Sequence, residues 1–172
     1  EHRMFIDDCK KLGLIPLTTA FSRRSVDELT KLDMDTIKVA SYDCASIPLI
    51  EDLAKNFSHL IISTGATYQS EIEKTAKLLI NKKVNFSFLH CTTIYPTPLE
   101  RVNLAKMSTL KKYTKKVGFS DHTHVESDGI IASIVAIHLG AEFIERHFTI
   151  LKPNQTKDGP VSINPNHVRQ MV

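Results

Sequence analysis

The sequence repeats one pattern six times: a short apolar or β-branched run, a small polar turn, and then a helix-like segment. The runs are residues 14–19, 36–41, 59–64, 86–91, 116–121 and 143–148. Continuous rather than alternating hydrophobicity is typical of strands buried on both faces, as in a parallel sheet. Strands that alternate with helices indicate consecutive βα units. The sequence therefore predicts an α/β fold with a parallel sheet.

A doubly wound sheet and a (β/α)₈ TIM barrel both contain such units. Polar side chains at the carboxyl ends of the runs favour the barrel, because a barrel carries its active site on that face. These side chains are Thr19, Lys38, Ser41, Ser63, Thr64, His90, Ser120, Asp121, His122 and His147. A complete barrel needs about 250 residues. We therefore expect residues 1–172 to form one partial-barrel domain that covers about strands three to eight.

Composition excludes several classes of protein. Hydrophobic residues make up 42% and charged residues 24% of the chain, which is ordinary for a globular domain. The apolar runs fall far short of the roughly 20 residues that a membrane span needs. A net charge of +3 with both signs mixed, and no basic stripe with aromatics, argues against a nucleic-acid partner. Three cysteines without a CxxC spacing favour a reducing, cytoplasmic location.

Two segments carry clear helix signals. Residues 129–139 are apolar over most of a helical circumference, so we expect this helix to be well buried. Asn164 followed by Pro165 predicts a helix start, because asparagine caps helices and proline suits their first position.

A pair of histidines is the strongest chemical signal. His122 and His147 each follow a predicted strand, and the two strands are consecutive. Two neutral imidazoles, completed by water or substrate oxygens, suit Mn²⁺, Fe²⁺ or Zn²⁺. His124 is close enough in the sequence to compete with His122 for this role. A packed or surface histidine is the structural alternative for each.

Lys38 is the next signal, because a lysine inside an apolar strand must face the barrel lumen or pair with an acid. A luminal lysine binds phosphate or carboxylate, or forms a Schiff base. Hydroxyl groups near strand ends can complete an anion site with it. The candidates are Thr19, Ser41, Ser63, Thr64 and Ser120. A structural salt bridge at Lys38 is the alternative.

Two loops add candidates. Tyr95 precedes Pro96-Thr97-Pro98, a loop stiffened by two prolines, which would hold the tyrosine over the barrel mouth. A plain packing turn is the alternative. Asp158 lies in a turn-forming stretch of the last loop, where it could contact a polyol or serve only the turn.

Six motifs in a fixed order closely resemble the N-acetylneuraminate (sialic acid) synthase family, which includes legionaminate, pseudaminate and spore-coat polysaccharide synthases. They are Ile37-Lys38-Val39-Ala40-Ser41, Ser63-Thr64-Gly65-Ala66, residues 89–98, Val102-Asn103-Leu104, residues 118–123 and residues 144–149. The resemblance runs over essentially the whole chain. It implies a (β/α)₈ barrel that condenses phosphoenolpyruvate with an N-acylated mannosamine-type aldose, giving a nonulosonic acid and phosphate.

The resemblance also implies roles. His122 and His147 would hold a divalent metal, Mn²⁺ first and Mg²⁺ or Co²⁺ as alternatives. Lys38, Ser41, Ser63 and Ser120 would bind phosphoenolpyruvate, and Tyr95 would touch the sugar. We expect catalytic roles for Lys38, Ser120 and Asp121. The substrate-binding set is Thr19, Ser41, Ser63, Thr64, Thr93, Tyr95 and Asp158.

The chain departs from the family pattern. The family's first two strands, which supply catalytic groups, and its C-terminal antifreeze-like domain are missing here, so we expect the chain alone to be inactive. Because that domain reaches the partner subunit's active site in the family, the resemblance implies a homodimer for the full-length protein. The last loop reads Asp158-Gly159-Pro160 rather than Gly-Pro-Asp, and Thr93 stands where some members have asparagine. Both changes concern the acceptor sugar. Two rivals remain open: a barrel aldolase with a Schiff base at Lys38, and a non-catalytic barrel fragment.

Overall fold

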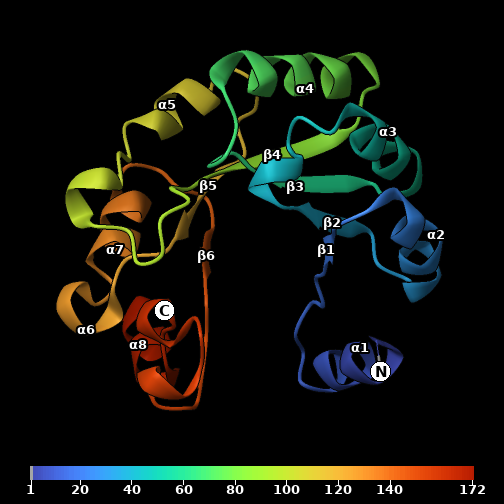
Figure 1. Cartoon of the computed structure of the whole chain (residues 1–172). Coiled ribbons are helices and arrows are strands. Elements are labelled where there is room, and N and C mark those ends of the chain that lie inside the picture. The colour runs from blue at the N-terminus through green and yellow to red at the C-terminus, as the bar shows by residue number, and fades with distance from the viewer. Residues whose placement is uncertain (1) are drawn as a thin grey trace. The chain divides into compact units, whose positions relative to one another are not determined.

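A computed structural model describes residues 2–172. The chain forms two compact units, the first ending at Ser87 and the second running from Phe88 to Val172. The strand β4 (Asn85–His90) passes from the first unit into the second (Figure 1). Within each unit, neighbouring strands are parallel and follow the order of the chain.

The first unit builds its sheet from three strands. Its elements are α1 (His2–Lys11), β1 (Thr19–Ala20), α2 (Val26–Leu29), β2 (Thr36–Val39), α3 (Ile47–Asn56), β3 (His59–Ser63) and α4 (Gln69–Asn81), with 3₁₀ turns at Arg23–Ser25, Thr30–Leu32 and Ser41–Asp43. Thr19 lies opposite Lys38, and Lys38 opposite Ile61. The core contains seven aliphatic side chains that are fully buried: Ile37, Val39, Ile50, Leu53, Leu60, Ile62 and Leu79.

The second unit continues the same alternation. Its elements are α5 (Lys106–Leu110), β5 (Val117–Asp121), α6 (Val125–Asp128), α7 (Ile131–His138), β6 (Ile144–Arg146) and α8 (Pro165–Met171), with 3₁₀ turns at Leu99–Arg101, Pro153–Gln155 and Gly159–Val161. In β5 and β6, Phe119 lies opposite Ile144, Ser120 opposite Glu145, and Asp121 opposite Arg146. Asn164 caps α8 by accepting from the N–H groups of Asn166 and His167, as predicted. The α/β prediction with parallel strands is confirmed.

Two expectations are wrong in detail. Residues 14–18 do not form a strand, because Pro16 cannot donate to a ladder and Ile15 is 91% exposed. Only Thr19–Ala20 pairs with β2. Helix α7 is buried only on its small-residue side, through Ala132, Ser133 and Ala136. Three of its larger apolar side chains are exposed, Ile131, Val135 and Ile137, as is Leu139 directly after the helix.

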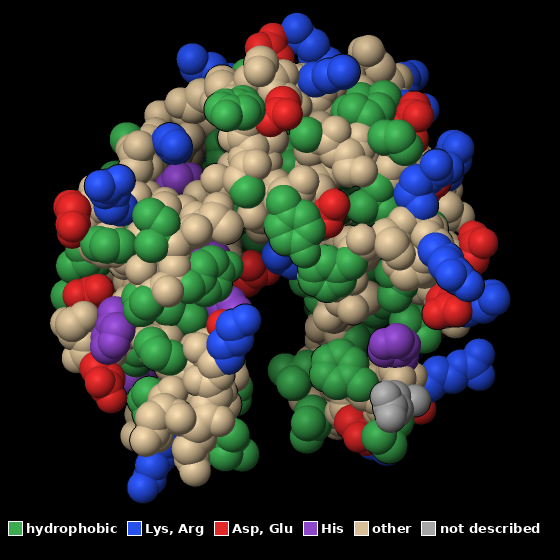
Figure 2. Space-filling view, viewed as in Figure 1, with side chains coloured by type: hydrophobic (Ala, Val, Ile, Leu, Met, Phe, Trp, Pro, Cys, Tyr) green, Lys and Arg blue, Asp and Glu red, His purple; other side chains and the backbone are tan. Residues whose placement is uncertain are grey.

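Helix α1 also carries exposed apolar side chains, which Figure 2 shows as a gathering of hydrophobic atoms over that helix. They are Met4 and Phe5, and the chain that follows adds Leu12, Leu14 and Ile15. Gly13 ends the helix at φ +71°, a left-handed conformation that glycine adopts without strain. Among the described residues, no helix is long and apolar enough to cross a membrane.

Candidate functional site

The two predicted metal ligands lie side by side in the second unit. His122 directly follows β5 and His147 directly follows β6, and these strands are paired neighbours. Their ring centroids are 5.4 Å apart. His122 is 5% exposed, whereas His147 is half-buried. The carboxyl ends of adjacent parallel strands therefore bring together two imidazoles that are 25 positions apart in the sequence.

Tyr95 joins this pair. Its hydroxyl lies 2.7 Å from Nε2 of His122, and its ring packs 4.0 Å from that imidazole and 5.8 Å from His147. The Tyr95–Pro96 peptide bond is cis. Thr97 anchors the loop, because its N–H donates to the His122 carbonyl at 2.8 Å and its hydroxyl donates to the Ile94 carbonyl at 2.6 Å. The predicted stiff loop thus holds Tyr95 against the histidines.

Glu145 is a member of this cluster that the sequence reasoning did not select. The Ser120 hydroxyl donates to Oε1 of Glu145 at 2.7 Å and lies 3.4 Å from Nε2 of His122. The signal that could have found Glu145 is the one used for Lys38, a charged residue inside a strand. We call Tyr95, Ser120, His122, Glu145 and His147 the histidine cluster.

The electrostatics of the cluster keep His122 neutral at pH 7. Burial and the neighbouring His147 lower the pKa of His122 to about 4, against the opposing effect of Glu145 and the Thr92 carbonyl. Burial, with Cys91, Glu145 and Asp158, raises the pKa of Tyr95 to about 12. Tyr95 therefore keeps its hydroxyl proton at neutral pH, and it can donate this proton to Nε2 of His122 when the neutral ring carries its own proton on Nδ1.

These residues fit a divalent metal ion. A neutral imidazole is the form of histidine that binds metals, and the low pKa of His122 supplies it. The buried Nδ1 of His122 makes no well-aligned hydrogen bond to the described residues. No group of three or more His, Cys, Asp or Glu side chains in residues 2–172 forms a metal-binding set. The fit is therefore to a two-histidine site completed by oxygen atoms from water or substrate.

The loop after β6 brings Asp158 to the histidine cluster. Asp158 Oδ2 lies 3.6 Å from Nδ1 of His147. The Asp158 carbonyl accepts a hydrogen bond from the Ser162 hydroxyl at 2.7 Å, which holds the turn. Thr93 is exposed in the loop that carries Tyr95. The shifted Asp-Gly-Pro order thus still leaves a carboxylate next to the histidine cluster.

Two other predicted residues lie elsewhere. His124 caps α6, where its Nδ1 accepts from the Ser127 N–H at 3.3 Å, so its ring already has a structural partner. Asp121 is 0% exposed and pairs with Arg146. Because successive strand residues point to opposite faces, Asp121 faces away from Ser120 and its neighbours. Its catalytic role stays a prediction that this placement does not favour.

The anion-binding candidates lie in the first unit. Register places Thr19 opposite Lys38, and Lys38 opposite Ile61, two residues before Ser63. Residues opposite each other in a parallel pair share a face, so Thr19, Lys38 and Ser63 lie on one face of this sheet. The Ser63 hydroxyl is buried without a hydrogen-bond partner among the described residues. Ser41 and Thr64 are also buried, and the Ser41 carbonyl accepts from Thr67.

Parallel βα units with polar groups at the strand ends define an α/β protein of the TIM-barrel type. The model of the NeuB family matches residues 1–172, and the chain belongs to that family. N,N'-diacetyllegionaminic acid synthase of Campylobacter jejuni is 37% identical over 174 residues, which covers 99% of this chain and 51% of that protein. The chain spans about half the length of the curated relatives it matches.

Solved structures agree with this assignment. N-acetylneuraminic acid (sialic acid) synthetase from Leptospira borgpetersenii, solved in complex with citrate, matches with a TM-score of 0.91 and 30% identity over 98% of this chain and 58% of that one. DAHP synthase from Thermotoga maritima matches with a TM-score of 0.83 at 13% identity, over 99% of this chain and 52% of that one. The second likeness shows the fold alone.

Proposed function

We propose that the protein containing this chain is a nonulosonic acid synthase. It condenses phosphoenolpyruvate with an N-acylated mannosamine-type aldose and releases phosphate. Membership of the NeuB family and the likeness to legionaminic and sialic acid synthases support the class. The observation that carries the proposal is the histidine cluster, in which two imidazoles, a carboxylate and a phenol meet at the ends of paired parallel strands.

His122 and His147 would hold the divalent metal, Mn²⁺ first and Mg²⁺ or Co²⁺ as alternatives. Bound there, the ion acts as a Lewis acid that makes the aldehyde carbon a stronger electrophile. Tyr95 and Asp158 would orient the sugar hydroxyls, since both lie against the histidines. Thr93 would contact the same substrate from the exposed part of the loop.

The first unit would bind phosphoenolpyruvate. Lys38, with Thr19 and Ser63 on the same face, supplies a cation and hydroxyl groups for phosphate and carboxylate oxygens. Ser41 and Thr64 would complete this set. Ser120, which was expected in the same set, lies in the second unit against Glu145.

The reaction balances with these groups. The C3 carbon of phosphoenolpyruvate attacks the aldehyde carbon, and water adds to the cation that develops at C2. The aldehyde oxygen becomes a hydroxyl group by taking up the proton that this water loses. Glu145, held by Ser120, is our candidate to transfer that proton. The resulting tetrahedral carbon expels phosphate and becomes the C2 ketone, and its hydroxyl proton leaves with the phosphate, whose charge Lys38 would stabilise.

Location and assembly are also proposals. The cysteines Cys9, Cys44 and Cys91 are all free thiols, which supports a reducing, cytoplasmic setting. We propose a homodimer for the full-length protein, on the basis of the family resemblance.

Phosphate release by the full-length protein tests the proposed function. The protein is given phosphoenolpyruvate, Mn²⁺ and a panel of aldoses led by N-acetylmannosamine. We expect release that requires both the metal and one of the sugars. No release with any sugar, from a folded protein that binds Mn²⁺, would contradict the proposal. Borohydride trapping of a carbonyl substrate on Lys38 would instead support the aldolase alternative.

A further inference from the structure

We propose that Asp121 and Arg146 form a positioning pair that holds His122 and His147 at the spacing needed to share one metal ion. The inference rests on the metal site of the proposed function. Neither residue would touch the metal or the substrate. Each is instead the residue directly before one of the two histidines, on the two strands that the pair joins.

The pair is a cross-strand contact at the carboxyl ends of β5 and β6. Asp121 lies directly opposite Arg146 in the register, and Nη1 of Arg146 is 2.5 Å from Oδ2 of Asp121. Their side chains are 0% and 2% exposed, so solvent does not weaken the interaction. This ion pair is thus the last side-chain contact between β5 and β6 before the chain reaches the two histidines.

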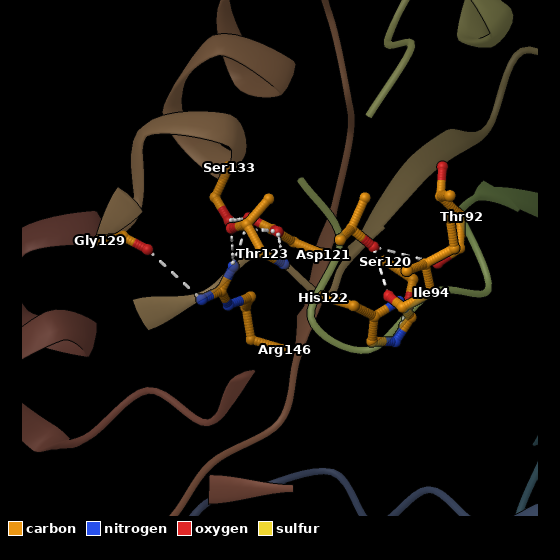
Figure 3. A network of polar contacts seen from close by, with 10 residues as sticks. Thr92, Ile94, Ser120, Asp121, His122, Thr123, Gly129, Ser133 and Arg146 are labelled. Carbon is orange, nitrogen blue, oxygen red and sulfur yellow. Dashed lines mark hydrogen bonds and ion pairs between the residues drawn. The ribbon is translucent and has the colours of Figure 1, made fainter. Parts of the chain in front are cut away.

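Because side chains alternate along a strand, this ion pair lies on the face of the sheet opposite the histidine cluster. Figure 3 shows Asp121 and Arg146 pointing toward Ser133 of α7, with Ser120 and His122 on the other side of β5. Ser120 and Glu145 make the corresponding contact on the site face. The ends of β5 and β6 are therefore held together on both faces of the sheet. The Ser120–Glu145 hydrogen bond lies on the side of the histidine cluster, and the Asp121–Arg146 ion pair lies on the opposite side.

The carboxylate of Asp121 has no capacity left for a substrate. Its Oδ1 accepts from the N–H and the hydroxyl of Thr123 at 2.9 and 2.8 Å, and its Oδ2 accepts from the Ser133 hydroxyl at 2.6 Å as well as from Arg146. Thr123 follows His122 directly. The bonds from Asp121 therefore bracket His122 and set the path of the backbone on both sides of it.

Arg146 is anchored in the same way. Its Nη1 donates to the Thr123 hydroxyl at 3.0 Å and its Nη2 to the Gly129 carbonyl at 3.4 Å. The guanidinium thus connects β6 to the loop that carries His122 and to the chain between α6 and α7. Its Nε is buried without a partner in the part of the chain that the structure describes.

Stability alone is a weak reason for such a pair. Replacing a buried ion pair by apolar residues of similar volume is often neutral or stabilising, because desolvating two charges is costly. A directional, multiply bonded pair does supply what an apolar contact lacks, a defined lateral position of β5 against β6. Groups that hydrogen-bond metal-binding histidines typically change metal affinity by 10–100-fold when they are removed. Asp121 and Arg146 act instead through the backbone next to each histidine, so we expect an effect at the lower end of that range.

The test compares Mn²⁺ affinity with stability in the full-length, metal-free protein. The double variant Asp121→Asn/Arg146→Gln removes both charges together and leaves no buried charge unpaired. We expect its dissociation constant for Mn²⁺ to rise at least about tenfold, and the absorption spectrum of bound Co²⁺ to change. Arg146→Lys keeps the charge, and we expect it to stay within about threefold of the parent.

The matched control is Thr75→Val in the first unit. It removes another buried hydroxyl contact, the 2.6 Å bond to the Cys44 carbonyl, and we expect it to lower stability without changing Mn²⁺ affinity. A merely structural role for the pair would predict that both variants lower the melting temperature and neither changes the affinity. That result would overturn the inference and leave the proposed function standing.

Two further outcomes are decisive. If the parent protein binds no Mn²⁺, the metal site of the proposed function fails and the inference fails with it. If the double variant does not fold, Ser133→Ala replaces it, because it removes one bond to Asp121 and keeps both charges. We then expect a loss of Mn²⁺ affinity of about threefold at an unchanged fold, and an unchanged affinity would overturn the inference.

Discussion

The hydroxyl of Tyr95 lies 2.7 Å from Nε2 of His122. In the neutral tautomer that carries its proton on Nδ1, Nε2 accepts the hydrogen bond from this hydroxyl. A nitrogen that accepts this hydrogen bond cannot at the same time bind a metal ion. Metal binding through Nε2 therefore requires Tyr95 to give up the contact, which leaves its hydroxyl next to the ion and available to a sugar substrate.

Tyr95→Phe should tighten Mn²⁺ binding. A hydrogen bond of this kind is worth about 1 kcal/mol net, so we expect about fivefold higher affinity, together with slower phosphate release. Isothermal titration with Mn²⁺ measures the first effect. Tyr68→Phe, at an exposed tyrosine of the first unit, is the matched control. An unchanged affinity would mean that His122 does not use Nε2.

His122→Ala and His147→Ala should each abolish Mn²⁺ binding, because two imidazoles are the only nitrogen ligands that the cluster offers. The control is His124→Ala, which removes the cap of α6 and should cost about 1 kcal/mol of stability at unchanged metal affinity. Equilibrium dialysis against Mn²⁺ measures all three. If His124→Ala loses Mn²⁺ binding while His122→Ala keeps it, His124 is the ligand and the assignment of His122 is wrong.

Lys38→Ala should weaken phosphoenolpyruvate binding by about tenfold or more, since a charge-assisted contact to an anion is lost. Lys31→Ala, at an exposed lysine of the same unit, should leave the affinity unchanged. Titration of the full-length protein with phosphoenolpyruvate provides the measurement. Equal affinity in Lys38→Ala and the parent would remove Lys38 from the binding site.

Acid should destabilise the metal-free protein through His122. The unfolded chain takes up this proton near pH 6.5, whereas the folded protein resists it down to a pKa of about 4. Between these values the unfolded state binds more protons, so stability falls as the pH falls, by up to about 3 kcal/mol. Urea unfolding at pH 7 and pH 4.5 should show a smaller loss for His122→Gln than for the parent.

The control for the pH experiment is His138→Gln, at the end of α7, where the ring is not part of the cluster. We expect this variant to keep the full acid-dependent loss. If the free energy of unfolding falls equally with pH in the parent and in His122→Gln, another group causes the acid-dependent loss.

Gly118→Ala should destabilise the second unit by about 2–3 kcal/mol. A Cβ atom there would lie 2.5 Å from the Phe143 carbonyl oxygen and 2.7 Å from the Phe143 ring, so β5 and the chain before β6 would have to separate. Gly13→Ala meets nothing within 4 Å and should cost about 1 kcal/mol through its positive φ alone. Equal losses in chemical unfolding would rule out the close approach as the cause.

Local patterns were enough to predict most of the framework. Continuous apolar runs marked five strands correctly, but the run at residues 14–19 forms a strand only at Thr19–Ala20, although the Thr18 carbonyl also accepts from the Lys38 N–H. The all-round apolar sequence of α7 predicted burial, yet its small residues face the sheet and its larger ones are exposed. A hydrophobic sequence shows that a side chain can be buried, and only its neighbours decide whether it is.

The sequence by itself determined the alternation of strand and helix and the placement of His122 and His147 at strand ends, because both follow from short-range patterns. The tertiary structure alone decided that Ser120 lies opposite Glu145, that Asp121 lies opposite Arg146, and which pair faces the histidines. Strand register depends on contacts between segments far apart in the chain, and a shift of one residue exchanges the two faces. For that reason Asp121, which the motif places beside His122, lies behind the candidate site, and Glu145 lies within it.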